Sequence, residues 1–211
     1  MKIAIFGITG YTGGNIAREA LTRGHTLIGS ARRTIDAGLP DEVTLIGADI
    51  HDPDAVLSVV GDSDAIIVAV TAHGEKNLNL ALPGLLDAAR TAGARLGIVG
   101  GAASLKRSED GPRIFDDGFP EEARDEARAQ LDVLDTLLSS ETDQEWFYLS
   151  PAERYGSWEK DERRGTYRTG GNVVVTDAEG ISRISGEDLA LAVIDELENP
   201  QHRNRRFTVA Y

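Results

Sequence analysis

The chain has 211 residues, a formal net charge of -13 and no cysteine. Its acidity argues against nucleic acid or an anionic membrane as the main partner, because both require a basic surface. The lack of cysteine excludes disulfides, a thiolate nucleophile and a cysteine metal site, and it suits a cytoplasmic protein. The four histidines show no metal-ligand spacing, and no apolar run approaches the ~20 residues of a membrane span. The length predicts a single domain.

An apolar strand at the start of the chain leads directly into a glycine-rich turn. The segment Lys2 to Phe6 is followed by GITGYTGGN, which places Gly7, Gly10 and Gly13 in a GxxGxxG frame. We expect Gly7 to permit a sharp turn, Gly10 to admit a pyrophosphate and Gly13 to let the next helix pack closely. A helix expected over Asn15 to Arg23 would direct unpaired N–H groups and its positive dipole end toward phosphates. The segment therefore predicts a dinucleotide-binding turn.

Three polar side chains stand between these glycines. The hydroxyls of Thr9 and Thr12 can donate to phosphate oxygens, and each threonine is equally suited to cap the helix. Tyr11 lies in the same turn, and we count it with them among the expected cofactor-binding residues.

Strands alternate with helices along the following 130 or so residues, as in parallel α/β proteins. Further strands are expected over 25–30, 43–46, 65–70, 96–99 and 145–149, with helices behind Asp52 and Pro53 and over 78–91 and 121–139. The run Ala65 to Val70 is continuously apolar, as in a parallel strand that is covered on both faces. The pattern predicts an α/β fold, with a doubly wound parallel sheet of the Rossmann type.

The alternation changes after Pro151. A polar loop over 159–164, a β-rich stretch around Val173 to Val175, a helix from Glu187 to Glu198 and a last strand from Phe207 to Val209 follow. We interpret residues 1–150 as the cofactor-binding core. Residues 151–211 are then a small C-terminal cap beside the carboxyl ends of the strands, within the same domain.

The end of the second strand bears on the choice of nucleotide. NAD-selective folds of this kind place an acidic residue there for the ribose 2′-hydroxyl, whereas this strand ends in Arg32 and Arg33. Guanidinium groups bind a 2′-phosphate through charge-assisted hydrogen bonds, so the sequence favours NADP(H) over NAD(H). The alternative is that both arginines belong to a solvated turn.

The sequence lacks the YxxxK pair with which most short-chain dehydrogenases protonate a carbonyl. The residues four positions beyond the first four tyrosines are Asn15, Ala152, Glu159 and Gly171, and Tyr211 ends the chain. A carbonyl reductase or a sugar-nucleotide epimerase needs a positioned acid or base. A flavin or quinone relaxes this need, because its conjugated system accepts hydride at one atom and can collect a proton from solvent.

Four segments beyond the glycine loop carry a specific resemblance. They are GGAASL from Gly100, DGFP from Asp117, LSPA from Leu149, and the stretch from Gly180 to the end. With the GxxGxxG loop, they resemble the bacterial group called "putative NADH-flavin reductase", which consists of NmrA-like, atypical members of the short-chain dehydrogenases. The resemblance covers essentially the whole chain, and it implies a Rossmann NAD(P)-binding fold and flavin reduction.

The resemblance also implies site residues around the nicotinamide. Gly101 and Ser104 would border the nicotinamide, where Ser104 either orients a ring or caps the turn. Pro151 follows the sixth strand, where backbone commonly meets the carboxamide. Glu153 stands near a histidine of the biliverdin-reductase relatives. It would protonate an acceptor if burial raised its pKa, and the alternative is an exposed or salt-bridged glutamate.

The adenosine half has its own candidates. Asp49, followed by Ile50, stands where related proteins bind the adenine amino group, and Asp49 could equally cap the next turn. Ala69, Val70 and Thr71 end the fourth strand, and we expect them beneath the adenosine ribose, because ligands lie across the carboxyl ends of the strands.

The leading interpretation is an NADP(H)-binding oxidoreductase that reduces a flavin or quinone by hydride transfer, with FMN or FAD as substrate rather than prosthetic group. Tyr155 and Trp158 would cover the flat ring or anchor the cap. The alternative is an NmrA-like NADP-sensing regulator without turnover, and a sugar-nucleotide epimerase is a third interpretation. We expect a monomer or homodimer.

Overall fold

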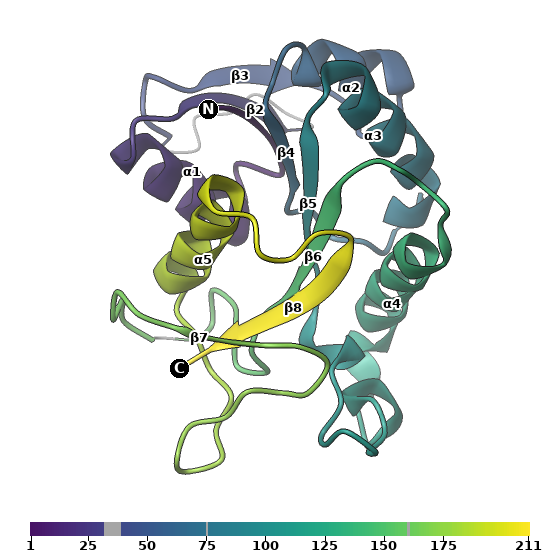
Figure 1. Cartoon of the computed structure of the whole chain (residues 1–211), viewed down its shortest axis with the longest axis vertical. Helices are drawn as coiled ribbons and strands as arrows, with labels where there is room; N and C mark the ends of the chain where they lie inside the picture. Colours follow the sequence, from purple (N-terminus) through teal and green to yellow (C-terminus); the bar gives the residue numbers. More distant parts are fainter. Residues whose placement is uncertain (32–38, 75, 160) are drawn as a thin grey trace.

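The computed structural model describes residues 1–31, 39–74, 76–159 and 161–211. Within them, eight strands form one sheet in the order β3-β2-β1-β4-β5-β6-β8-β7 (Figure 1). Their bounds are β1 Lys2–Phe6, β2 Thr26–Ala31, β3 Thr44–Gly47, β4 Ala65–Val68, β5 Arg95–Val99, β6 Trp146–Ser150, β7 Arg168–Gly170 and β8 Arg205–Ala210. All neighbours pair in parallel except β7 and β8. The order 3-2-1-4-5-6 is that of doubly wound dinucleotide-binding folds, which confirms the predicted fold class.

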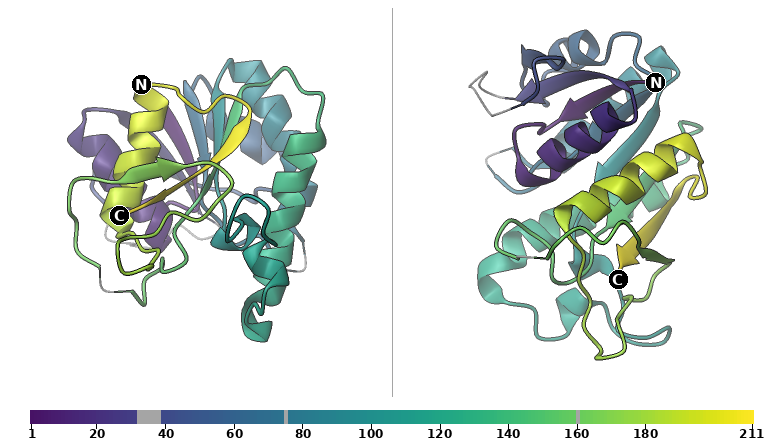
Figure 2. Two further views of the ribbon diagram at one scale, coloured as in Figure 1. Left: turned by 60° about the horizontal axis from the view of Figure 1, so that its bottom comes forward. Right: turned by 90° about the vertical axis from the view of Figure 1, so that its left-hand side faces the viewer.

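Helices cover both faces of this sheet. They are α1 Tyr11–Thr22, α2 Pro53–Val60, α3 Leu78–Ala92, α4 Arg124–Ser139 and α5 Gly186–Glu198. In the end-on view of Figure 2, α1 and α5 lie on one side and the remaining helices on the other. Side chains alternate accordingly: Phe147 of β6 packs with the α1 and α5 layer, and Tyr148 packs with the opposite layer. Two apolar cores thus hold the strands between them.

Several expected boundaries differ from the structure. β4 ends at Val68 and not at Val70, so Ala69 to Thr71 lie in the loop that follows it. α1 begins at Tyr11 and not at Asn15, because its glycine-rich first turn is folded against the preceding loop and does not depend on helix propensity. The β-rich stretch at Val173 to Val175 was a wrong prediction. Val173 forms only an isolated bridge to Lys106, since these valines pair with the loop after β5, and the strand beside β8 is β7.

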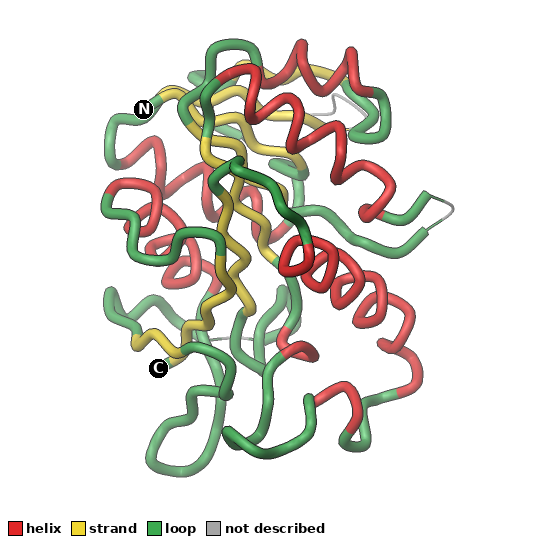
Figure 3. Tube along the Cα trace, turned by 45° about the vertical axis from the view of Figure 1, so that its right-hand side comes forward, coloured by secondary structure: helices red, strands yellow, loops and turns green. Residues whose placement is uncertain are grey.

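Residues 151–211 contribute to the same sheet and to the same helix layer. β8 pairs in parallel with β6, and α5 packs along α1. The two helices approach closely at their first residues, where a Cβ on Gly186 would lie 2.6 Å from the Tyr11 hydroxyl. Figure 3 shows that the loops between 151 and 185 gather at one end of the sheet, near the carboxyl ends of the strands.

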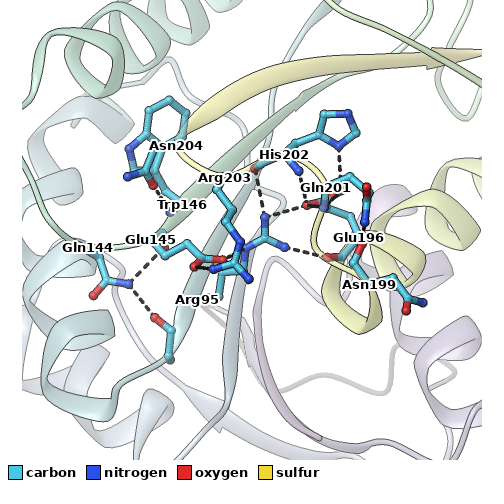
Figure 4. Close-up of polar contacts among 11 residues, drawn as sticks. Arg95, Gln144, Glu145, Trp146, Glu196, Asn199, Gln201, His202, Arg203 and Asn204 are labelled. Carbon is cyan, nitrogen blue, oxygen red and sulfur yellow. Dashed lines mark hydrogen bonds and ion pairs between the residues drawn. The ribbon is translucent and has the colours of Figure 1, made fainter.

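A buried ionic network fastens the opposite, amino edge of the sheet (Figure 4). Nη2 of Arg95 lies 2.6 Å from Oε1 of Glu196, and Nη1 donates to the Glu196 carbonyl at 2.6 Å. The same carboxylate accepts from Nδ1 of His202 at 2.7 Å. Arg95 begins β5, Glu196 lies near the end of α5, and His202 precedes β8. The network therefore connects β5, α5 and the segment before β8 at the amino edge of the sheet.

Candidate functional site

The glycine loop joins β1 to α1 at the carboxyl edge. Gly7 has φ of +84° and donates its N–H to the Ser30 carbonyl at 3.0 Å. A Cβ on Gly7 would lie 2.3 Å from the Ala69 carbonyl oxygen, and a Cβ on Gly13 would lie 2.2 Å from the Gly7 carbonyl oxygen. Backbone packing therefore requires glycine at both positions. Gly10 differs, since it is exposed and a Cβ there would meet only the Gly7 oxygen, at 3.3 Å.

The first turn of α1 presents backbone donors that have no partner among the described residues. Gly10 is the N-cap residue, and it has no side chain to bond the N–H groups that begin the helix. The N–H groups of Tyr11, Thr12 and Gly13 precede the first internal hydrogen bonds of α1. Three donors and the positive end of the helix dipole thus face an exposed loop without a Cβ at its apex. These residues fit a dinucleotide pyrophosphate.

The side chains of this turn are engaged with the C-terminal segment. The Thr12 hydroxyl lies 2.8 Å from the Tyr155 hydroxyl, and the Tyr11 hydroxyl accepts from the Gly186 N–H at 3.1 Å. The rings of Tyr11 and Tyr155 lie 5.8 Å apart. Burial raises the pKa of Tyr155, which keeps its hydroxyl protonated. Thr9 is exposed beside them, so it is the freer of the two threonine hydroxyls.

Part of the expected adenosine site lies outside the described residues, namely Arg32 and Arg33. Asp49 follows β3, where its carboxylate accepts from the His51 backbone at 3.0 Å and from the His51 ring at 3.0 Å. Lys76 donates to its other oxygen at 3.2 Å. The hydrogen bonds from His51, with that from Lys76, lower the pKa of Asp49 to about 2. Asp49 therefore closes the turn, and Ile50 packs partly buried against the core.

The loop after β4 adjoins the glycine loop. Ala69 and Val70 are partly buried, Thr71 is exposed, and the Ala69 N–H donates to the Phe6 carbonyl at 2.9 Å. Next in the chain, the side chain of His73 is half exposed and its Nδ1 lies 2.6 Å from Oε2 of Glu126. Sequence reasoning considered His73 only as a metal ligand and missed this pair. Its position in the loop that follows a strand, at the ligand-binding edge, was the available signal.

The loop after β5 carries Ser104 with its hydroxyl turned inward. A Cβ on Gly100 would overlap the Tyr148 hydroxyl, at 1.8 Å, so the loop presses on β6. Ser104 is 3% exposed, and its Oγ lies 3.0 Å from Oγ of Ser150 and accepts from Nη1 of Arg206 at 3.0 Å. Gly101 is partly buried at the start of this turn. Because the Ser104 hydroxyl is saturated by internal partners, it supports the loop's shape.

The segment after β6 runs from Pro151 past the glycine loop. Pro151 is buried, and the carboxylate of Glu153 accepts from Nη1 of Arg107 at 2.7 Å. Tyr155 reaches Thr12, so the segment is fastened to the loops after both β5 and β1. Trp158 is 76% exposed and lies over the backbone of Gly156, where a Cβ would be 2.4 Å from its ring.

All five tyrosine hydroxyls have internal partners. Tyr148 donates to the Gln130 carbonyl at 3.1 Å, Tyr167 to Asp195 at 2.6 Å and Tyr211 to Asp188 at 2.5 Å, besides the contacts of Tyr11 and Tyr155. A tyrosine that protonates a substrate must reach it. For Tyr148, Tyr167 and Tyr211, whose hydroxyls donate internally, this adds a spatial argument to the missing YxxxK pattern. The Tyr11 hydroxyl only accepts a hydrogen bond and keeps its proton.

Other kinds of site receive no support in the described ranges. No three histidine or acidic side chains there lie together as metal ligands would. None of the helices in that part of the chain has the length and hydropathy needed to cross a bilayer. A hollow of about 490 Å³, lined by Tyr167, Asp195, His202 and others, lies against α5 and β8 and shares no residue with the carboxyl edge.

Comparison with known proteins agrees with the geometry. Residues 7–200 match the family model described as NAD(P)H-binding. Over 99% of its length the chain is 36% identical to the uncharacterized protein YwnB of Bacillus subtilis strain 168, with 98% of that protein covered. A structure titled "putative epimerase", from Bacteroides thetaiotaomicron, has a TM-score of 0.85 and 32% identity, with 100% and 96% of the two chains covered. A "putative NADH-flavin reductase" from Streptococcus pneumoniae has a TM-score of 0.84 and 30% identity, with coverage of 100% and 99%.

The fold and the glycine loop define a dinucleotide-binding protein of the Rossmann type. The chain belongs to the NAD(P)H-binding family, and the predicted family is confirmed. A nicotinamide cofactor and an oxidoreductase-like fold follow from this membership. The two names carried by the similar structures disagree about chemistry, so the reaction has to be argued from the site.

Proposed function

We propose that the protein is an NADP(H)-dependent reductase that transfers hydride to a flavin or a quinone. The observation that supports this proposal is the state of the tyrosines: the sequence has no YxxxK pair, and the hydroxyls of Tyr148, Tyr167 and Tyr211 donate to internal acceptors. Carbonyl reduction and epimerisation both need a positioned proton donor or acceptor. A conjugated ring that accepts hydride at one atom needs mainly alignment with the nicotinamide.

The cofactor is held in this proposal by the residues of the carboxyl edge. The loop Gly7 to Gly13 would bind the pyrophosphate through the first N–H groups of α1, and Arg32 with Arg33 would bind the 2′-phosphate. Ala69 to Thr71 would line the ribose. Gly101 and Pro151 would border the nicotinamide, because they follow the carboxyl ends of β5 and β6. When bound, the reduced nicotinamide supplies the hydride.

The acceptor would meet the exposed aromatic face of the segment after β6. Trp158 is three-quarters exposed on a segment that is fastened to the glycine loop through Tyr155. An exposed indole held against a glycine backbone offers a flat apolar surface at low entropic cost. The S. pneumoniae structure named as a flavin reductase supports this choice of acceptor. FMN or FAD would then be a substrate that leaves after reduction.

The test is NADPH oxidation with FMN, FAD and menadione as separate acceptors. Sustained oxidation that depends on the acceptor supports the reductase. Tight NADPH binding without turnover, against all three and a wider set of carbonyl compounds, would contradict it and favour the NADP-sensing regulator.

A further inference from the structure

His73 lies on the loop that follows β4, at the same edge of the sheet as the candidate site. β4 is flanked in the sheet by β1 on one side and β5 on the other. The glycine loop leaves β1 and the Ser104 loop leaves β5 at the same edge. A dinucleotide that extends from the glycine loop toward β5 must therefore cross the loop that carries His73.

Glu126, in the first turn of α4, organises this loop. Its two carboxylate oxygens accept from the Ala72 N–H at 3.0 Å and from the His73 N–H at 3.0 Å. Nε2 of Gln130 donates to Oε1 at 2.9 Å, and the His73 ring contacts Oε2 at 2.6 Å. Burial of Glu126 would raise its pKa, but the hydrogen bonds outweigh burial and lower it. The group is therefore an anion at neutral pH.

The Glu126 carboxylate determines which nitrogen of the His73 ring carries the hydrogen. A carboxylate only accepts hydrogen bonds, so Nδ1 of His73 must carry the hydrogen in the 2.6 Å contact. In the neutral ring, Nε2 then carries the lone pair. In the protonated ring, both nitrogens carry hydrogen, and the N–H that is not bonded to Glu126 is that of Nε2. Among the described residues Nε2 has no protein partner, and the side chain is 52% exposed.

In the described part of the chain, the charged groups near the His73 ring, other than Glu126, are paired with other residues. Lys76, on the same loop, is paired with Asp49 at 3.2 Å, and His51 is bonded to that same carboxylate. No other acidic side chain in the described ranges lies within 4 Å of the His73 ring. The ring thus has one fixed nitrogen and one nitrogen directed away from Glu126.

We propose that His73, oriented by Glu126, assists the reductase as a proton donor that water can replace, so that alignment with the nicotinamide remains the main requirement. The inference rests on the proposed function. In the reaction, the nicotinamide loses a hydride and is oxidised, and the acceptor gains the hydride and is reduced by two electrons. Negative charge develops on a nitrogen or oxygen atom of the acceptor, and this atom receives the proton from Nε2 of the protonated ring. Solvent then reprotonates Nε2, which the exposure of the side chain permits. Glu126 is a positioning residue.

The kinetic test compares His73→Ala and His73→Gln with wild type in NADPH oxidation. General acid catalysis is worth roughly 10²- to 10⁴-fold. Because water can substitute for the donor, we expect a loss of about a hundredfold in kcat, with NADPH affinity and far-UV circular dichroism unchanged. Added imidazole should restore much of the rate of His73→Ala. His25→Ala is the matched control, since His25 also lies 3.0 Å from a carboxylate, that of Glu198, but at the amino edge. It should keep full activity and show no response to imidazole.

A second readout is independent of turnover. Nitrogen-15 NMR of the His73 ring should show hydrogen on Nδ1 in the neutral form, and Glu126→Gln should weaken that preference. Wild-type turnover with fast His73 variants, or a neutral ring that carries hydrogen on Nε2, would overturn the donor role while the reductase stands. A wild type that turns over no acceptor would overturn the proposed function and the donor role with it.

Discussion

Single residues of the carboxyl edge differ in whether they shape the protein or meet the ligand. Ser104 belongs to the first kind, because its buried Oγ lies between Ser150 and Arg206. We predict that Ser104→Ala lowers flavin or quinone reduction less than tenfold. It should also lower the free energy of unfolding by about 1–3 kcal/mol, because Nη1 of Arg206 loses its acceptor. Urea unfolding and steady-state kinetics measure both effects. A thousandfold loss of rate with normal stability would make Ser104 a direct participant.

Glu153 should be similarly tolerant. Its carboxylate accepts from Nη1 of Arg107 at 2.7 Å, and this contact fastens the segment after β6 to the loop after β5. We predict that Glu153→Gln lowers turnover less than tenfold, an effect of roughly 1.4 kcal/mol or less on the barrier. The measurement is kcat with menadione. If the rate instead falls a thousandfold while NADPH still binds, Glu153 supplies a proton and the chemistry is closer to carbonyl reduction.

Gly10 belongs to the second kind of residue. A Cβ there would meet only the Gly7 oxygen, at 3.3 Å, and Gly10 is exposed, so we expect the fold to accommodate a side chain. The new atoms would occupy the space before the first N–H groups of α1. We predict that Gly10→Val abolishes NADPH binding and leaves circular dichroism largely unchanged. Gly13→Ala is the contrast, because its Cβ would lie 2.2 Å from the Gly7 oxygen and should destabilise the fold itself. Tight NADPH binding by Gly10→Val would show that the loop holds no phosphate.

At the scale of elements, the amino-edge network joins β5, α5 and β8. Glu196 is 4% exposed, and Arg95 also lies 2.7 Å from Glu145. We predict that Glu196→Gln lowers the free energy of unfolding at pH 7 by about 3 kcal/mol, at the low end for a broken buried pair, because Glu145 still neutralises Arg95. The control is Glu198→Gln on the same helix, whose pairs are partly exposed and should contribute under about 1 kcal/mol. Equal effects of the two variants would contradict this account.

The same network gives an acid dependence. Burial would raise the pKa of Glu196, but hydrogen bonds from His202 and Arg95 outweigh it and lower the pKa. A carboxyl whose pKa is lower in the folded state contributes stability above its unfolded pKa, about 4.3, and the contribution is lost as pH falls through the folded value. We predict that wild type and Glu196→Gln converge in unfolding free energy below about pH 4. Urea titrations at several pH values measure it, and a constant difference down to pH 2 would refute it.

At the scale of the whole molecule, the sequence predicted the helices and strands well, but it predicted the side-chain contacts between them poorly. Buried parallel strands such as β4 are continuous apolar runs, so local pattern suffices to find them. His73 and Glu126 stand 53 positions apart, and Ser104 and Arg206 stand 102 apart, so only the strand order brings them together. The short β7 was missed for the same reason, since it exists through pairing with β8 and not through β propensity.

The choice of cofactor also depends on the whole molecule. A net charge of -13 opposes every anionic ligand, and it opposes NADP(H) more than NAD(H), because the 2′-phosphate adds negative charge. A preference for NADP(H) must therefore come from close contacts, for which we propose Arg32 and Arg33. Loss of one charge-assisted contact costs about 1.5–3 kcal/mol, or roughly ten- to a hundredfold in affinity. We predict such a preference in wild type and its loss in Arg32→Ala. Titrations of both cofactors near 0.15 M salt, where screening over ~8 Å suppresses the long-range field, isolate the contact. Equal wild-type affinities would show that these arginines belong to a solvated turn.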